Sequence, residues 1–275
     1  MLALLLLLLA VPDVVKNARV ETRSLDGSLA AAVAAASSSD EAAWAGWSVP
    51  LHGTANACCF DWGPRGRLRG GCCGLESSRG VSMGDEGRRG EPPTRLHVLV
   101  RVVKGAADRV RAYTDDCGLD AEGRRFVWLE GVKAGESVAF LRGLLSAAAR
   151  TRHELDEVLT ALSLHAAPEA VQALVAVAKA DASGEARGQA LFWLAQRAGA
   201  LARAAITRAI EEDPETDVKR QAVFALSEMP PDEGVPLLID LARRHKNPAV
   251  REQAFFWLGE SEDPRALAFF EEVLR

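Results

Sequence analysis

The residues of this sequence that could most directly do chemistry are its five cysteines. They are Cys58, Cys59, Cys72, Cys73 and Cys117, and all lie in the first half of the 275-residue chain. Thiolate zinc sites generally use pairs of cysteines separated by two residues, whose side chains converge from a turn. Adjacent cysteines in an extended chain point to opposite faces instead. The two adjacent pairs therefore favour disulfide bonds over a zinc site.

We expect one cysteine of the first pair to bond to one cysteine of the second, because neighbouring cysteines rarely bond to each other. In the chain-entropy model, closing a loop of roughly 15 residues stabilises the folded state by about 3 kcal/mol. Cys117 is then available for one of the two cysteines that remain, which leaves one free thiol. The spacing leaves open which cysteines pair and which one is free.

A catalytic cysteine activated by histidine is the alternative use of these thiols, since His52 and His97 occur in the same region. Nothing in the sequence places either histidine beside a cysteine, and a single histidine in a strand is usually structural. Arginines between residues 63 and 93 suggest RNA binding, but acidic residues are mixed with them and aromatic residues are absent. We therefore expect no catalytic residue, no cofactor, no metal ion and no nucleic-acid partner.

The elements that must position the cysteines follow from the hydrophobic pattern. Residues 96–103 alternate and are rich in β-branched side chains, which predicts a strand. A turn at 105–108 leads to a second strand at 109–113, and a third is expected at 125–129. Shorter strands are expected at 47–51 and 57–62, and a helix at 137–149. These elements predict an α+β domain over residues 44–150, built on a small, mostly antiparallel sheet.

The chain begins with an apolar run, residues 2–11, that is too short to span a membrane. The run is typical of the apolar core of a secretory signal peptide, which we place at residues 1–20. Residues 21–43 include the low-complexity run AAAVAAASSS and are predicted to be a linker. Export would carry the cysteines into an oxidising compartment. We therefore expect a periplasmic or extracellular protein with no stable membrane span after signal cleavage.

The carboxyl-terminal part of the chain contains an internal repeat with a period of 32 residues. The segments 186–194, 218–226 and 250–258 align without gaps, and a degenerate copy falls at 154–162. Each full copy has a basic residue, a glutamine and a phenylalanine at fixed positions. These repeat-signature residues are Arg187, Gln189, Phe192, Lys219, Gln221, Phe224, Arg251, Gln253 and Phe256. A period in this range is typical of stacked structural repeats.

The pattern of each copy predicts a pair of helices. Apolar residues recur at i, i+4, i+7 and i+8 from Val218, which is one face of a helix, and Asp217 precedes that helix as a candidate N-cap. A second apolar helix is predicted over residues 233–242, after two prolines. One such pair cannot bury both of its faces alone, so successive pairs must stack. Residues 151–275 are therefore predicted to form an α-solenoid of about four helix pairs.

The residues of the last copy carry a resemblance to a known family. Val250-Arg251 followed by Ala254 and Leu258-Gly259, with Asn247-Pro248 before them, resembles the HEAT repeat in its short HEAT-like, or PBS-lyase-type, form. The chain is also similar to secreted bacterial HEAT-repeat proteins of unassigned function. The resemblance covers about residues 152–275. It implies a solenoid whose concave surface binds other macromolecules, preceded by a cysteine-bearing segment.

The repeated side chains allow two interpretations each. The phenylalanines, with Trp193 and Trp257 beside them, form either an exposed binding stripe or the filling between neighbouring repeats, and apolar residues at helical spacing usually belong to the core. The basic residues form either a ladder on the concave face or bonds to carboxylates and carbonyls at the turns between repeats. The structural interpretation is favoured for both.

Two enzyme families share this type of repeat. Deoxyhypusine hydroxylase resembles it but binds iron through His-Glu pairs near several helix starts, and here only His153-Glu154 shows that pair. Bilin lyases of the phycobilisome share it too, and no residue of this chain specifies a tetrapyrrole site. A HEAT-like lyase therefore remains an alternative function, beside a thiol- or metal-dependent enzyme in the cysteine-containing domain.

Composition narrows the function further. A net charge of -5 disfavours an ordinary basic nucleic-acid binder, and 48% hydrophobic residues exclude a disordered chain. We therefore predict a non-catalytic protein–protein interaction scaffold of the cell envelope, which binds a protein partner through a solenoid surface and a disulfide-linked head.

Overall fold

The structure is a computed structural model that describes residues 15–54, 56–58, 60–62, 68–70, 73–77, 82–84, 91–145, 152–197 and 199–275. The chain divides into two compact units. The first, here called the head, comprises Met1–Ala147 and Leu164–Ala166. The second, here called the helical unit, comprises Ala148–Ser163 and Ala167–Arg275. The sequence predicts this division at residue 150.

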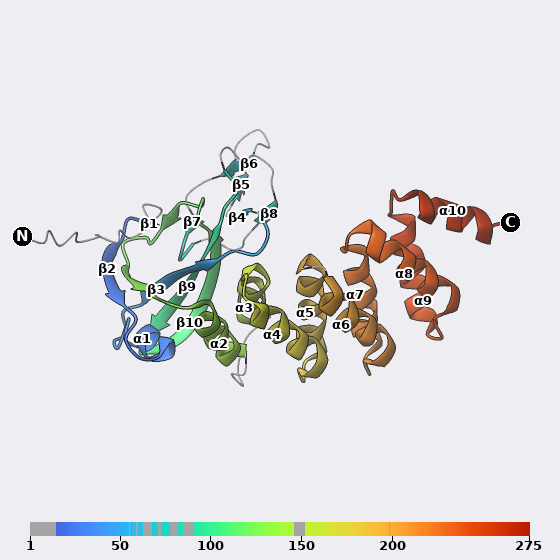
Figure 1. The fold of residues 1–275 in the computed structure, drawn as a ribbon. Helices are drawn as coiled ribbons and strands as arrows, with labels where there is room; N and C mark the ends of the chain where they lie inside the picture. The colour runs from blue at the N-terminus through green and yellow to red at the C-terminus, as the bar shows by residue number, and fades with distance from the viewer. Residues whose placement is uncertain are drawn as a thin grey trace, which may run out of the picture. The chain divides into compact units, whose positions relative to one another are not determined.

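A five-stranded sheet forms the centre of the head (Figure 1). In spatial order its strands are β10 (Ala106–Thr114), β9 (Arg95–Val103), β3 (Ala43–Pro50), β12 (Arg125–Glu130) and β2 (Arg19–Ser24). Strands β10 and β3 run antiparallel to β9, whereas β12 runs parallel to both β3 and β2. The sheet is therefore mixed, with the expected antiparallel pairs on one side and parallel pairs on the other.

The hairpin between β9 and β10 turns earlier than the sequence suggests. Lys104 and Gly105 form the turn, with φ of 51° and 76°, and positive φ at both central residues is the geometry of a type I′ turn. Strand β10 therefore begins at Ala106, and a bulge between Ala107 and Arg109 accommodates one extra residue. The predicted turn at 105–108 included this bulge because Gly and Asp are both frequent turn residues.

Apolar layers cover both faces of the sheet. On one face lie helices α1 (Leu29–Ala34) and α2 (Ala134–Leu145), and the indole Nε1 of Trp47 donates a 2.9 Å hydrogen bond to Ser137 Oγ of α2. On the other face, the buried side chains of Trp44, Tyr113 and Trp128 pack with the cysteine-bearing segments. Because both faces are covered, β9 is buried without interruption from residue 96 to residue 100.

The cysteine-bearing part of the head consists of very short strands. They are β1 (Val15–Lys16), β4 (Asn56–Cys58), β5 (Phe60–Trp62), β6 (Leu68–Gly70), β7 (Cys73–Gly74), β8 (Ser82–Gly84) and β11 (Leu119–Asp120). Strands β1, β11 and β7 pair in parallel, while β4 pairs with β8 and β5 with β6 in antiparallel fashion.

The prediction of a linker over residues 21–43 is wrong. Strand β2 pairs with β12 along its whole length, from Arg19 to Ser24, and α1 follows with Ser28 as its N-cap. The Ser28 hydroxyl accepts a hydrogen bond from the amide of Ala31 over 3.2 Å. Small residues made this segment look like a linker, yet Val33 and the alanine at 36 are buried. The segment is therefore part of the head.

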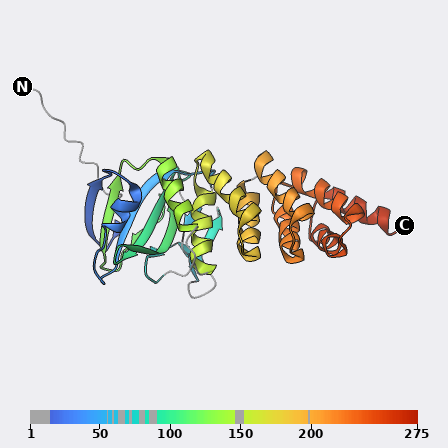
Figure 2. The same ribbon diagram turned by 90° about the horizontal axis from the view of Figure 1, so that it is seen from below.

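The helical unit is an α-solenoid. Its helices are α3 (Arg152–Leu164), α4 (Pro168–Ala180), α5 (Gly184–Arg197), α6 (Gly199–Glu212), α7 (Thr216–Ser227), α8 (Pro231–Arg244), α9 (Pro248–Gly259) and α10 (Pro264–Val273). They form four successive pairs, and Figures 1 and 2 show that these follow one another in a row. Helices α5, α7 and α9 pack in succession, and α4 packs against α6 and α8 against α10. The predicted architecture is confirmed.

The 32-residue period sets equivalent positions on equivalent helices. Ala186, Val218 and Val250 are each the third residue of their helix, and each is buried. The expected cap is displaced in one copy, because α7 begins at Thr216 and Asp217 lies inside its first turn. There the Asp217 carboxylate accepts a 2.9 Å hydrogen bond from Arg220, so it does not act as the N-cap.

His97 makes the stability of the head depend on pH. Its side chain is only 3% exposed and lies edge-on to Trp128, and within the described part of the chain neither ring nitrogen has a hydrogen-bond partner. Burial lowers the pKa of His97 to about 4, while Asp115 raises it and Arg95 lowers it to smaller extents. The unfolded chain therefore binds a proton between pH 6.5 and 4 that the folded head does not bind.

We expect the free energy of unfolding to fall as the pH drops from 7 to 4, with roughly 3 kcal/mol of the fall due to His97. In the variant His97→Leu this contribution disappears, so its stability should depend less on pH over the same interval. Urea titrations of both proteins at pH 7, 5.5 and 4 measure the difference. Parallel pH profiles for the two proteins would contradict this assignment.

Candidate functional site

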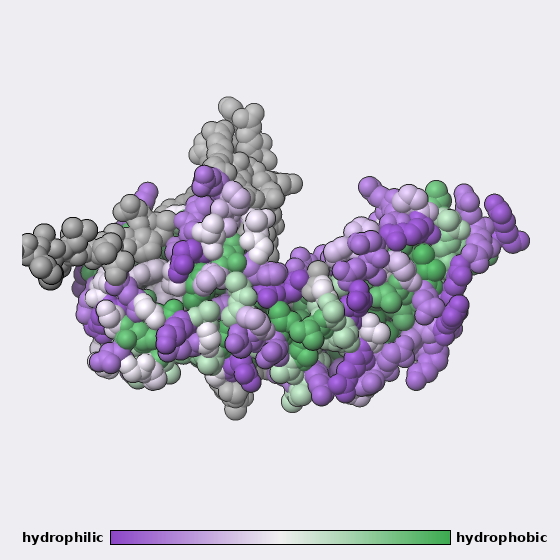
Figure 3. Space-filling view, in the orientation of Figure 1, coloured by the Kyte–Doolittle hydropathy of each residue, from purple (hydrophilic) through white to green (hydrophobic). Residues whose placement is uncertain are grey.

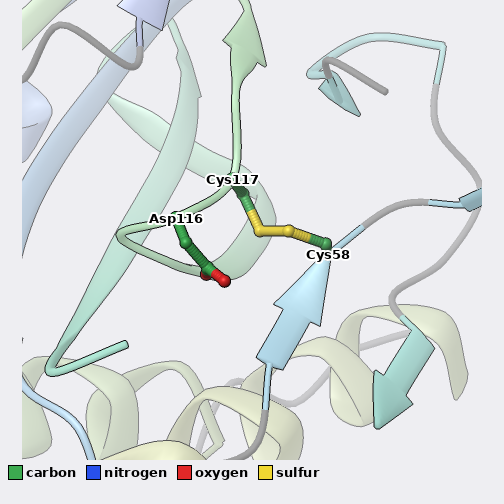
Figure 4. A group of neighbouring side chains, drawn as sticks. All are labelled: Cys58, Asp116 and Cys117. Atoms are coloured by element: carbon green, nitrogen blue, oxygen red, sulfur yellow. A yellow bond between two sulfur atoms is a disulfide. The ribbon is translucent and has the colours of Figure 1, made fainter. Parts of the chain in front are cut away.

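The three cysteines among the described residues are all disulfide-bonded. Cys58, at the end of β4, forms a disulfide with Cys117, which lies just before β11 (Figure 4). Cys73 of β7 is also in a disulfide, and its partner lies outside the described residues. Cys59 and Cys72 themselves lie outside those residues. Cys117 thus pairs with one of the adjacent cysteines, which was one of the pairings that the sequence left open.

These bonds exclude the sulfurs of all three described cysteines as nucleophiles or metal ligands. The sulfurs of Cys58 and Cys117 lie near the Asp116 carboxylate, within 4.8 Å of one another. A bonded sulfur is not a thiolate, and thiolate is the form that attacks or ligates. The Asp116 carboxylate instead accepts hydrogen bonds from Thr114 Oγ1 at 2.6 Å and Asn56 Nδ2 at 2.5 Å. The cluster therefore holds a turn against β4.

The repeated basic residues bond to backbone carbonyls at the turns between helices. Arg187 donates to the carbonyl of Asp181 at 2.9 Å, and Lys219 donates to the carbonyl of Ile210 at 2.6 Å. Arg251 donates to the carbonyl of His245 at 2.7 Å. In each copy the cation thus bonds to carbonyls in the last turn of the preceding helix or at its C-cap, where the backbone lacks partners within the helix. This geometry matches the structural interpretation and not a basic ladder.

Arg187 also forms a buried ion pair. Its Nε and Nη2 donate to the two carboxylate oxygens of Asp213 at 2.7 and 3.0 Å, and Nη2 reaches Glu215 at 2.9 Å. The hydrogen bond to Asp213 raises the pKa of Arg187, although burial opposes it. Burial alone would raise the pKa of Asp213, but the hydrogen bonds from Arg187 and from the Glu215 amide leave it below its ordinary value. Both groups are therefore charged in the folded protein.

The repeated phenylalanines and Trp257 form a row of contacting rings across three repeats, here called the aromatic ladder. The rings of Phe192 and Phe224 are parallel within 7°, with centroids 6.0 Å apart, and Phe224 lies 4.9 Å from Trp257. Phe256 packs edge-on against Trp257. The rings thus bridge neighbouring repeats, as the structural interpretation expects. They also reach the surface, since Phe192 and Phe224 are half-buried and Phe256 is 54% exposed.

The surface of the helical unit is not uniformly polar. Figure 3 shows apolar side chains over α4 and α5 and again towards α8 and α9, with polar side chains between them. The large apolar side chains that are exposed in this unit are Leu201, Phe256, Leu267, Val273 and Leu274. Exposed apolar surface rimmed by polar residues is typical of protein-binding sites.

A groove of about 490 Å³ lies beside the ladder, between α5 and α7, and is here called the α5–α7 groove. It is lined by Gly184, Glu185, Gly188, Gln189, Phe192, Glu215, Asp217, Val218, Gln221 and Phe224. The two glycines lie one turn apart on the same face of α5. A Cβ on Gly188 would overlap the side-chain oxygen of Gln221, and one on Gly184 would overlap the Glu215 carboxylate. The glycines therefore let these side chains lie across α5.

Most residues of this groove are absent from the sequence prediction, which includes only the repeat signature. The sequence feature that could have indicated the groove residues is a position at which one copy differs from the other copies of the repeat. The positions equivalent to Gly188 hold Arg220 and Glu252 in the next two copies. Glycine inside a helix costs about 1 kcal/mol relative to alanine, so Gly188, in the interior of α5, calls for a local reason.

The comparison with protein families agrees with this architecture. The model that describes HEAT repeats matches residues 203–275, from within α6 to the end of α10. HEAT repeats are generally protein-interaction scaffolds. A search of curated protein sequences finds no match to this chain. The secreted, bacterial character that the resemblance implies stays a prediction.

The buried ion pair of Arg187 with Asp213 can be tested by its contribution to the stability of the helical unit. The variant Asp213→Asn leaves the Arg187 guanidinium without its buried counter-charge, and breaking a buried pair in this way costs roughly 3 kcal/mol. Glu215→Gln is the matched control, because that side chain is 55% exposed and its ion pair is worth less than about 1 kcal/mol. Denaturant titration at pH 7 measures both.

The pH dependence follows from the lowered pKa of Asp213. Its contribution is complete above the ordinary value of 3.8 and is lost as the pH falls through the lower folded value. The wild type and Asp213→Asn should therefore differ at pH 7 and converge in strong acid. Equal losses of unfolding free energy for Asp213→Asn and Glu215→Gln at pH 7 would show that the buried ion pair contributes no more to stability than the exposed one.

Proposed function

We propose that the protein is a non-catalytic scaffold of the cell envelope that binds a protein partner through the α5–α7 groove and the aromatic ladder. One observation carries this proposal: half-exposed stacked rings border an open groove on a rigid row of helices. Aromatic side chains, phenylalanine among them, are enriched in the buried cores of protein interfaces. Their positions are held by stacking between repeats, so binding requires little ordering of the site.

The head supports the assignment to an oxidising compartment. Structural disulfides persist mainly in exported proteins, and Cys58 and Cys117 are bonded in a buried core. The apolar run at residues 2–11 is the matching export signal. Within the described residues, no helix has the length and apolar character needed to cross a membrane. A periplasmic or extracellular location agrees with the disulfide and with the apolar run.

The alternative functions have less support. A thiol enzyme, or one whose metal is bound by cysteines, needs free thiolates, and the three cysteines among the described residues are all in disulfides. A HEAT-like lyase needs ligand-binding groups on the repeats, but the repeated basic residues are occupied with helix carbonyls. The groove offers acids, amides and phenyl rings, which suit recognition of another protein.

Photo-crosslinking in the native cells tests the binding site. A photo-reactive amino acid placed at Gln221, inside the groove, should give an adduct of defined mass, whereas the same amino acid at Asp240, an exposed position on α8, should not. The variant Gly188→Leu fills the groove floor and should abolish the adduct. Gly135→Leu is its matched control, because a side chain at Gly135 meets no neighbour.

The proposal fails if the adduct forms equally at both positions, forms at neither, or persists in Gly188→Leu. Thermal melts check that Gly188→Leu still folds. Its stability should be close to that of the wild type, because replacing a helical glycine gains up to about 1 kcal/mol and the displaced Gln221 side chain is flexible at its end.

Export also makes a prediction about the mature amino terminus. Cleavage after residue 20 would cut β2, which pairs with β12 from Arg19 onwards, and cleavage after Lys16 would remove β1. We therefore expect the signal peptidase to cut before Val15, earlier than the boundary suggested by the sequence. Intact-mass measurement of the protein purified from the envelope fraction locates the cut to one residue. A mature chain that starts at residue 21 would contradict the pairing of β2.

A further inference from the structure

The α5–α7 groove contains acidic side chains without a basic residue among those that line it. The lining carboxylates are those of Glu185, Glu215 and Asp217. Glu215 is held from its buried side by Arg187, and Asp217 bonds to Arg220, whose side chain is 45% exposed. An exposed ion pair of this kind is weak, so a second cation can share or replace it. The groove therefore favours a cationic ligand.

The groove also holds an acceptor that lacks a donor. Gln189 Oε1 is buried, and within the described residues it has no hydrogen-bond partner. The carboxamide of Gln221 lies on the opposite wall, over Gly188. A buried acceptor without a partner is destabilising, and a ligand that donates a hydrogen bond to it recovers that cost. The ligand should therefore bring N–H groups as well as positive charge.

The third component of the groove is aromatic. Phe192 and Phe224 line it from adjacent helices, and each is half-buried, so part of each ring faces the groove. A guanidinium packs well on a phenyl ring because it is planar and weakly hydrated, and it carries five N–H donors for surrounding acceptors. A lysine ammonium is a compact, strongly hydrated charge and uses such a site less well.

We infer that the α5–α7 groove binds an arginine side chain, presented by an extended segment of the protein partner. This inference rests on the proposed function and adds the chemistry of the partner. The guanidinium contacts the rings of Phe192 and Phe224, donates to Gln189 Oε1 and is balanced by the carboxylates of the groove. Adjacent helices lie 8–10 Å apart, which is about three residues of extended chain. An apolar residue three positions from the arginine would then lie over Phe256 and Trp257.

Binding of defined peptides to the full, oxidised chain tests this inference. Three acetylated nine-residue peptides are identical except for arginine, lysine or citrulline at the centre, with leucine three positions later. Titration calorimetry at low ionic strength should show the arginine peptide binding about tenfold tighter than the lysine peptide. Citrulline keeps the shape but lacks the charge, so its peptide should bind more weakly still.

Variants assign the effect to the groove. Gln189→Leu should weaken the arginine peptide about tenfold, because it removes the acceptor, while the fold persists since that oxygen makes no hydrogen bond to the described chain. The double variant Glu185→Gln with Asp217→Asn should weaken both charged peptides. Asp240→Asn, an acid on α8 outside the groove, should change neither.

Equal affinities for the arginine and citrulline peptides, no saturable binding of any peptide, or full binding by Gln189→Leu would overturn the inference. These results leave the proposed function to its own test, since the crosslink at position 221 depends only on a partner occupying the groove. A crosslink that Gly188→Leu abolishes, together with no preference for arginine, would retain the scaffold and reject this ligand.

Discussion

Each helix pair of the second unit has an apolar face that it can bury only against its neighbours, and this constraint organises the molecule. Ala186, Val218 and Val250 occupy the same buried position in successive helices, so the interior repeats every 32 residues. Side chains at equivalent outward positions then point in the same direction in successive repeats. The stacked rings of Phe192 and Phe224 are held at a fixed separation for this reason, and the basic residue beside each buried position closes the turn below it.

The groove arises where one copy departs from that regularity. Helix α5 has glycine at two positions one turn apart, and in the next copies bulkier residues such as Arg220 and Glu252 take the place of Gly188. The missing side chains let Gln221 lie across α5. Arg187, which is paired with the buried Asp213, also bonds to Glu215 in the lining of the groove. The regular repeat thus holds the helices in fixed positions, and a local exception opens the groove to which we assign partner binding.

The repeat could be predicted from the sequence because stacking imposes a period that needs no knowledge of distant contacts. The head was harder, since its strand order depends on pairings between remote segments. The small residues at 30–39 are typical of a linker, although helix α1 covers the first of them. The parallel pairing of β2 with β12 joins segments far apart in the chain, so it produces no recognisable pattern in the sequence of either strand. The number and spacing of the cysteines limited the possible disulfide pairings, but they did not assign the bond between Cys58 and Cys117. Predicting the groove would have required a reason for Gly188. That reason is the Gln221 side chain lying against it, which only the structure shows.

The pairing of β2 with β12 has a consequence for the order of folding. Arg19 aligns with Arg125, so the chain must close a long loop before this edge of the sheet gains any contact energy. Contacts between successive helix pairs span far shorter stretches and can form as soon as those stretches exist. The head should therefore be the slower unit to mature, and during synthesis its first long strand waits unpaired until residue 130 has left the ribosome.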